Sequence, residues 1–239
     1  MALAAVMTAS LLAGCGGGST APTTAAGGDT TTAAGSEAGS QAEGGEEAAA
    51  PEETADRGNS IVYAIDAEPE TLDPGMCNYN KSSAVLLNLF NGLYRFSDDG
   101  SNVEPAMAES HTVSDDGLVY TFTLRDGLKW SDGSALTAAD FEYSWKRELD
   151  AELASPAAWN LFDIVNAEEY NNGECSADEV GVKAVDDKTL EVTLKNPTAY
   201  FISLTASANW APVKKDVVEG SDSWVKSADT YVCNGPFML

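Results

Sequence analysis

The sequence predicts an α/β fold, because stretches with strand periodicity alternate along it with stretches of helical periodicity. Residues 118–124 are apolar at every second position, as in a strand with one buried face. Farther along, Phe141, Trp145 and Leu149 recur at every fourth position, as on the buried face of a helix. Hydrophobic residues make up 44% of the 239 positions, which is enough for a packed core.

Two strands and a helix are expected before residue 97. Residues 61–65 form a short run of branched apolar residues, which predicts a buried strand. A stiff turn with two prolines follows at 68–75. Residues 82–91 predict a helix that starts with two serines, either of which can cap it, and that ends at Gly92. Residues 93–96 then predict an edge strand.

The strand at 118–124 is bounded by Asp-Gly pairs at 116–117 and 126–127, which suit turns with positive φ. Thr137 is a natural N-cap for the next helix, and Asp140 is the acidic partner of a capping box. The aromatic residues that follow on this helix are interpreted as core and not as a ligand site.

The last third of the chain predicts a hairpin and two short helices. Residues 180–185 and 190–194 flank a polar turn and are expected to pair as antiparallel strands. An apolar helix is expected at about 198–205, and another short helix after Pro212. The apolar end of the sequence, at 237–239, is expected to be an unpaired strand, open to association.

The N-terminus has the features of an export signal. Residues 1–14 are apolar and too short to span a bilayer, and residues 12–15 read Leu-Ala-Gly-Cys, as in a bacterial lipobox. We therefore interpret 1–14 as the remnant of a signal peptide and Cys15 as a lipidation site. An ordinary secretory signal with a chance cysteine is the alternative. The charged start of such a signal is missing, so we expect the protein to begin upstream.

Residues 15–59 are expected to be a disordered tether behind the lipidated cysteine. This segment consists mostly of Gly, Ala, Thr, Ser and Glu and contains no aromatic residue. It buries too little apolar surface to offset the entropy of ordering. A tether behind a lipid places the folded part outside the cytoplasm and close to a membrane.

Composition excludes several function classes. The net charge of −25 repels nucleic acid, and none of the common nucleotide, zinc or redox motifs occurs, so we expect no metal and no cofactor. His111 is the single histidine, which leaves a hydrolase without a catalytic constellation. Three cysteines follow the lipobox, namely Cys77, Cys175 and Cys233, so at least one is expected to be free or to pair outside this sequence.

A series of short motifs carries a resemblance to a known family. The series resembles the oligopeptide and dipeptide solute-binding proteins of ABC importers, from about Ile61 to the last residue. The motifs, in order, lie at 71–74, 88–94, 105–110, 114–117, 120–125, 129–133, 137–141, 143–147, 180–184, 189–194, 197–201 and 234–236.

The resemblance implies a periplasmic-binding-protein-like fold, type II, of the three-domain peptide-binding class. It further implies that 60–90 and 214–239 are a partial first lobe and that 91–213 are the second domain. The third domain is then missing, and we expect the sequence to be cut at both ends.

The resemblance also implies a ligand site. In this family the backbone of the peptide is met by the segment after the Leu-Asp-Pro turn, here Cys77, Asn78, Tyr79 and Asn80. A second contact comes from the loop at 155–157, where an aromatic residue often stands at the position of Ala157; Trp159 is expected to substitute for it. A loop with free N–H and C=O groups can pair with any peptide main chain. The alternative is that 77–80 are only a surface loop.

The function implied is a membrane-anchored, monomeric lipoprotein that captures peptides outside the cytoplasm and delivers them to the permease subunits of an ABC importer. It is not expected to be an enzyme. The family also includes binders of glutathione, metal chelates and oligosaccharides, so another small solute is an alternative ligand. A surface lipoprotein for adhesion or signalling, without transport, is the alternative from a different class.

Overall fold

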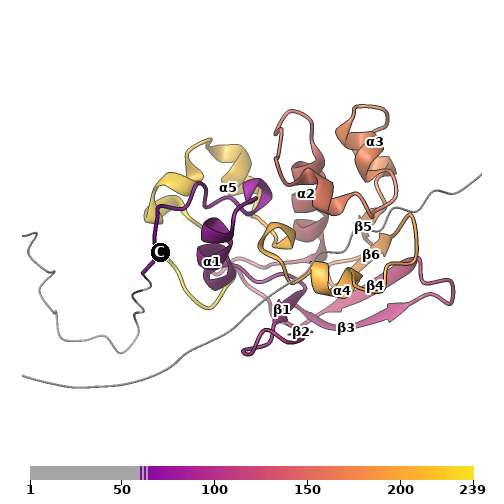
Figure 1. Cartoon of the computed structure of the whole chain (residues 1–239), viewed down its shortest axis with the longest axis horizontal. Helices are drawn as coiled ribbons and strands as arrows, with labels where there is room; N and C mark the ends of the chain where they lie inside the picture. Colours follow the sequence, from indigo (N-terminus) through magenta and orange to yellow (C-terminus); the bar gives the residue numbers. More distant parts are fainter. Residues whose placement is uncertain (1–59, 61, 63) are drawn as a thin grey trace, which may run out of the picture. The chain divides into compact units, whose positions relative to one another are not determined.

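The computed structural model describes residues 60, 62 and 64–239 (Figure 1). The predicted signal remnant, the lipidation site Cys15 and the tether lie outside the described residues. None of the helices in the described part has both the length and the apolar character that crossing a bilayer requires.

A four-stranded antiparallel sheet forms the centre of the fold, in the order β3-β4-β6-β5. The strands are Ala108–Val113 (β3), Val119–Leu124 (β4), Thr189–Thr193 (β6) and Val182–Ala184 (β5). Strand β4 has its predicted alternation, since Tyr120, Phe122 and Leu124 are buried. The predicted hairpin is also confirmed, as β5 and β6 pair antiparallel.

Helix α2 (Ala138–Leu149) packs on β5 and β6 (Figure 1). The predicted capping box is present: the N–H of Thr137 donates to the carboxylate of Asp140 at 2.8 Å. Phe141, Trp145 and Leu149 are fully buried, so the interpretation of this stripe as core is confirmed.

A smaller antiparallel pair, β1 (Tyr94–Phe96) and β2 (Val103–Pro105), follows helix α1 (Asn80–Leu89). The predicted caps of α1 are wrong. The helix begins after Tyr79, and Ser82 is buried inside it, where its hydroxyl accepts a hydrogen bond from the N–H of Thr71. Gly92 serves a close approach instead, because a Cβ there would lie 2.2 Å from the C=O of Thr205.

The remaining helices are short. They are α3 (Ala167–Asn171), α4 (Phe201–Leu204), α5 (Lys215–Gly220), and the 3₁₀ turns η1 (Pro74–Met76), η2 (Ala158–Leu161), η3 (Ala177–Glu179), η4 (Ala208–Trp210), η5 (Trp224–Lys226) and η6 (Ala228–Thr230). In the turns on either side of β4, Gly117 (φ +73°) and Gly127 (φ +71°) have the predicted positive φ.

The prediction of a strand at 61–65 is wrong for the residues that the structure describes. Residues 62, 64 and 65 are not in a strand, and Val62 is 82% exposed; residues 61 and 63 lie outside the description. A strand needs a neighbour for its N–H and C=O groups, and no described segment pairs with this one.

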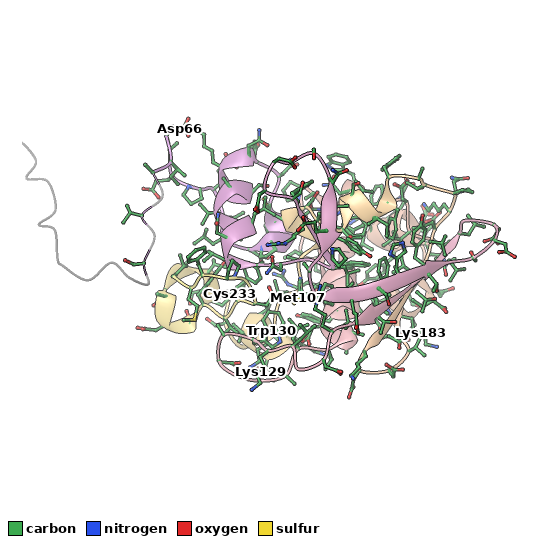
Figure 2. The ribbon with its side chains drawn as sticks, turned by 90° about the horizontal axis from the view of Figure 1, so that it is seen from below. Asp66, Met107, Lys129, Trp130, Lys183 and Cys233 are labelled. Carbon is green, nitrogen blue, oxygen red and sulfur yellow. The ribbon has the colours of Figure 1, made fainter. Side chains whose placement is uncertain are left out.

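The strand predicted at the end of the sequence is also wrong. Residues 237–239 form no strand. The chain is held there by backbone hydrogen bonds from Gly235 to Leu89 and from Phe237 to Asn88. Cys233, a few residues earlier, bonds through its backbone to Ser131 in the loop after β4. Figure 2 shows Cys233 close to Trp130, although the two are far apart in the sequence.

Candidate ligand-binding site

The turn before segment 77–80 is held by a buried ion pair. Asp73 caps η1, where its Oδ1 accepts from the N–H of Gly75 at 3.0 Å. Arg147 reaches the same carboxylate from α2 and donates to both oxygens, at 3.1 and 2.7 Å. The planar guanidinium matches a carboxylate in this bidentate geometry. The turn is therefore attached to the central helix of the fold.

Ser155 connects the two segments that the sequence predicted to bind ligand. Its hydroxyl donates to the C=O of Gly75 at 2.6 Å and accepts from the N–H of Ala157 at 3.0 Å. The turn that leads into 77–80 and the loop at 155–157 are thus neighbours in space, although about 80 residues separate them.

The last three residues of segment 77–80 lie at the surface. Asn78, Tyr79 and Asn80 are exposed, Tyr79 to 56%. The dihedrals of Cys77 and Tyr79 are extended. Among the described residues, no protein group bonds to the C=O of Cys77 or to either backbone group of Asn78. An extended stretch with unpaired N–H and C=O groups can pair with another extended chain.

The thiol of Cys77 faces inward. The residue is buried, and its Sγ lies 3.3 Å from the hydroxyl of Ser83. Cys175 and Cys233 are also free in the structure, so the three cysteines after the lipobox are unbridged. Cys77 therefore serves as a small packing residue behind the exposed segment.

The second predicted segment divides into a buried and an exposed part. Ala157 is fully buried, its N–H is bonded to Ser155, and its C=O accepts from the backbone and side chain of Asn160. It offers no free group to a ligand. Trp159, on η2, is 61% exposed and is the residue of this loop that presents an aromatic surface.

A buried carboxyl, which sequence reasoning missed, lies behind the turn. Glu148 follows Arg147 on α2 and is almost fully buried. One of its oxygens accepts from the amide of Asn209 at 3.4 Å, and the other has no partner among the described residues. Burial raises the pKa of Glu148 well above its ordinary value. The sequence gives one sign of its burial, which is its position next to Leu149 of the apolar stripe on α2.

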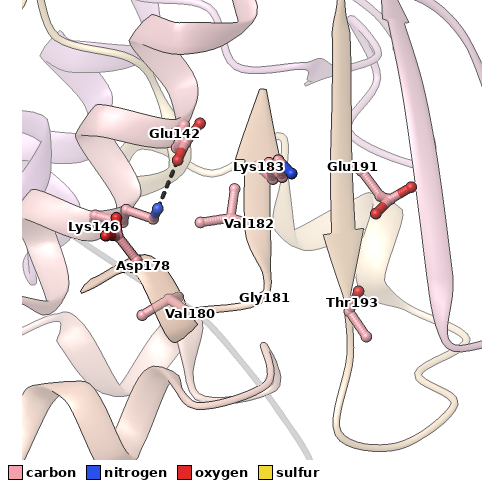
Figure 3. Close-up of a pocket in the computed structure, with 9 residues that line it drawn as sticks. All are labelled: Glu142, Lys146, Asp178, Val180, Gly181, Val182, Lys183, Glu191 and Thr193. Atoms are coloured by element: carbon pink, nitrogen blue, oxygen red, sulfur yellow. Dashed lines mark hydrogen bonds and ion pairs between the residues drawn. The ribbon is translucent and has the colours of Figure 1, made fainter. Parts of the chain in front are cut away.

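A hollow of about 390 Å³ lies elsewhere, between α2, η3 and the β5–β6 hairpin (Figure 3). None of the predicted ligand residues lines it. The carboxylate of Glu142 in its wall is already bonded, to Lys146 at 2.6 Å and to the N–H of Ala184 at 2.7 Å. This hollow therefore offers less to a ligand than the unpaired backbone of 77–80.

His111 has a structural environment. Its Nδ1 lies 2.6 Å from the hydroxyl of Tyr94, and its ring stacks near Tyr120 at the surface of the sheet. In the part of the chain that the structure describes, no group of three His, Cys, Asp or Glu side chains is placed to hold a metal ion.

Comparison with known proteins gives a consistent assignment. Residues 102–239 match the family described as bacterial extracellular solute-binding proteins, family 5, middle. The oligopeptide-binding protein OppA of Bacillus subtilis is 47% identical over 176 residues, which are 73% of this chain and 32% of that protein. A probable deoxycholate-binding periplasmic protein, YgiS of Escherichia coli, is 41% identical over 74% of this chain and 33% of that protein.

Among solved structures, OppA of Listeria monocytogenes bound to peptide superposes with a TM-score of 0.68 at 36% identity. The superposition covers 70% of this chain and 33% of that one. The chain thus spans about a third of the length of the relatives it matches, and its α/β fold is that of a type II periplasmic binding protein.

Proposed function

Because this chain belongs to family 5 of the bacterial extracellular solute-binding proteins, we propose that it is part of a protein that captures peptides and delivers them to the permease of an ABC importer. Binding and release, without catalysis, are then its whole activity. The relatives named as oligopeptide-binding and dipeptide-binding proteins support peptides as the ligand.

The observation that carries this proposal is the run of unpaired backbone groups formed by the C=O of Cys77 and both groups of Asn78, between the extended residues Cys77 and Tyr79. A receptor for peptides of varied sequence must bond to what all peptides share, which is the main chain. Tyr79 in this segment and Trp159 on η2 present exposed aromatic surface, which can pack against side chains of different shape.

The proposal includes the domain assignment. Residues 60–90 and 214–239 would belong to the first lobe and 91–213 to the second domain, and a third domain outside this sequence would close over the peptide. The fragment then has half a cleft, and it should bind peptides far more weakly than the full-length protein.

Calorimetry with mixed short peptides on the full-length protein tests the proposal. We expect binding at micromolar concentration or tighter, and Asn78→Pro, which removes the N–H and fixes φ, should weaken it by at least tenfold. Asp98→Pro, at an exposed turn position whose N–H bonds to none of the described residues, is the control. Micromolar binding by residues 1–239 alone would contradict the domain assignment.

A lipid anchor at Cys15 is the second part of the proposal, and it rests on the Leu-Ala-Gly-Cys motif. Mass spectrometry of the mature protein should find residues 1–14 removed and Cys15 acylated. Cys15→Ala should release the protein from the membrane. A wild-type mature protein that begins at another residue would contradict this part alone.

A different small solute is the second candidate ligand. The 41% identical relative named as probable deoxycholate-binding supports it, since that ligand is a steroid acid and not a peptide. A thermal-shift screen of the full-length protein with peptides, bile acids, glutathione and oligosaccharides separates the two, because only a bound ligand raises the melting temperature by mass action.

A further inference from the structure

We propose that Ser155 is a positioning residue, whose hydroxyl couples the two ligand segments and holds segment 77–80 in its binding conformation without touching the ligand. This inference rests on the proposed function, since it concerns the same site. It differs from a contact role, in which the loop at 155–157 would bond directly to a peptide.

The hydrogen bonds of the hydroxyl are the first step. A serine hydroxyl has a single proton to donate, and Ser155 donates it to the C=O of Gly75 at 2.6 Å. The oxygen also accepts from the N–H of Ala157 at 3.0 Å. The hydroxyl is therefore fully occupied as a donor inside the protein, and it joins two backbone groups that lie about 80 residues apart.

The backbone of Gly75 is the second step. Its N–H is held by the carboxylate of Asp73 and its C=O by Ser155, so side chains bond it on both sides. The residue packs closely against α2, because a Cβ on Gly75 would lie 3.1 Å from Nη1 of Arg147. The N–H and the C=O of Gly75 belong to two successive peptide units. The side chain of Asp73 holds the first, and Ser155 holds the second together with the bond from the N–H of Met76 to the C=O of Asp73.

The path from Gly75 to the ligand segment is short. The N–H of Cys77 closes the 3₁₀ turn onto the C=O of Pro74 at 3.0 Å. The next groups along the chain are the C=O of Cys77 and the N–H of Asn78, which are the unpaired groups of the site. Loss of the bond from Ser155 to the C=O of Gly75 would therefore let the C=O of Cys77 and the N–H of Asn78 change direction more freely.

Backbone strain next to Ser155 is an independent observation. Ala154 has φ +52°, in the left-handed region that costs free energy for any residue with a Cβ. The turn that ends α2 carries this strain, with the N–H of Ala154 directed at the C=O of Asp150. Strained residues persist where their surroundings hold them, and the two bonds of Ser155 fix the residue that follows Ala154.

The test compares Ser155→Ala with Ser155→Thr, which keeps the hydroxyl, in the full-length protein. The control is Ser134→Ala, which removes a hydroxyl bonded to Asp132 in an exposed turn. Two quantities are measured, namely peptide affinity by calorimetry and the hydrogen exchange of the Cys77 amide without ligand.

We expect Ser155→Ala to weaken binding by about fivefold to tenfold, the equivalent of one lost hydrogen bond, and to speed exchange at Cys77 by a similar factor. Ser155→Thr should restore both, and the control should change neither. Weaker binding with unchanged exchange would indicate a direct contact and overturn the inference. So would faster exchange with unchanged affinity, which is the pattern of a purely structural bond.

The exchange measurement also separates this inference from the proposed function. A full-length protein that binds no peptide refutes peptide capture whatever Ser155 does. In that case unchanged exchange at Cys77 in Ser155→Ala would overturn the coupling of the two segments as well. Faster exchange would support that coupling but would overturn its role in peptide binding.

Discussion

The sheet with helix α2 and the candidate ligand site are held together by different forces. The core between sheet and helix consists of apolar side chains such as Phe122, Phe141 and Trp145, all fully buried. The turn at the site is held by directional polar bonds, from Arg147 to Asp73, from Ser155 to Gly75 and from the hydroxyl of Tyr231 to the C=O of Leu72 at 2.7 Å.

This difference matches the roles proposed for the two regions. Apolar burial is strong but not directional, so it sets the shape of a core without fixing single peptide units. Hydrogen bonds contribute less free energy each, yet they fix the direction of a backbone group. A binding segment that leaves one edge unpaired is better held by bonds from behind than by burial, which would cover it.

The largest effect is expected in the core. Trp145→Ala should destabilise the protein by about 3–5 kcal/mol, because it leaves a cavity in the core. It also removes the hydrogen bond that the indole N–H of Trp145 donates to the C=O of Trp210 at 3.0 Å. Denaturant unfolding measures this. Tyr200→Ala, at an exposed aromatic residue, is the control and should stay within about 0.5 kcal/mol. A loss below 1 kcal/mol for Trp145→Ala would contradict the assignment of this core.

The buried ion pair should come second, and it should also change ligand binding. Arg147→Met leaves the carboxylate of Asp73 buried and unpaired, which costs about 3 kcal/mol. Arg95→Met breaks the exposed pair with Glu104 and should cost less than about 1 kcal/mol. Calorimetry should find weaker peptide binding only for Arg147→Met. If the two variants lost stability and peptide affinity equally, the buried ion pair would have no special role in holding the turn at Asp73.

Periodicity predicted the apolar region and missed the polar one for the same physical reason. Strand β4 and helix α2 bury a regular stripe, which is visible in a local window of sequence. Strand β3 was missed because only Ala108 of its six residues is buried, so it shows no alternation. The cap of α1 was misplaced because Ser82, a good N-cap by type, is instead bonded to the distant Thr71.

The position proposed for the site came from the family resemblance, which implied segment 77–80, the loop at 155–157 and Trp159. Their roles remain predictions. The bond from Ser155 to Gly75 joins residues about 80 positions apart, and no local pattern contains such a bond. Glu148 was missed since a glutamate in a helix is normally solvated.

Another polar contact, beyond the C-terminal end of helix α1, sharpens the comparison. The side chain of Asn234 accepts from the N–H of Asn91 and donates to its C=O, at 3.1 and 2.9 Å. Asn234→Ala should therefore cost about 1–2 kcal/mol. Peptide affinity should not change, because this contact does not support the turn at Asp73.

Asn102→Ala, at an exposed asparagine, is the matched control for stability. A marked loss of affinity in Asn234→Ala would mean that the polar contacts act as one network and not as separate supports.

The last prediction is a gain of stability at neutral pH in Glu148→Gln. Burial raises the pKa of Glu148, with Asp73 raising it further, while Asn209 and Arg147 oppose the shift. Above its ordinary pKa the unfolded chain loses this proton while the folded protein keeps it, so the stability that Glu148 contributes falls as pH rises toward the folded pKa. Glutamine has the shape of the neutral carboxyl and does not titrate, so the variant has no such loss of stability.

Denaturant midpoints from pH 4 to 8 should show the variant close to wild type at pH 4 and increasingly more stable than wild type above it. The exposed Glu152→Gln should show no such divergence, and a constant difference between Glu148→Gln and wild type at all pH values would mean that Glu148 is charged in the folded protein.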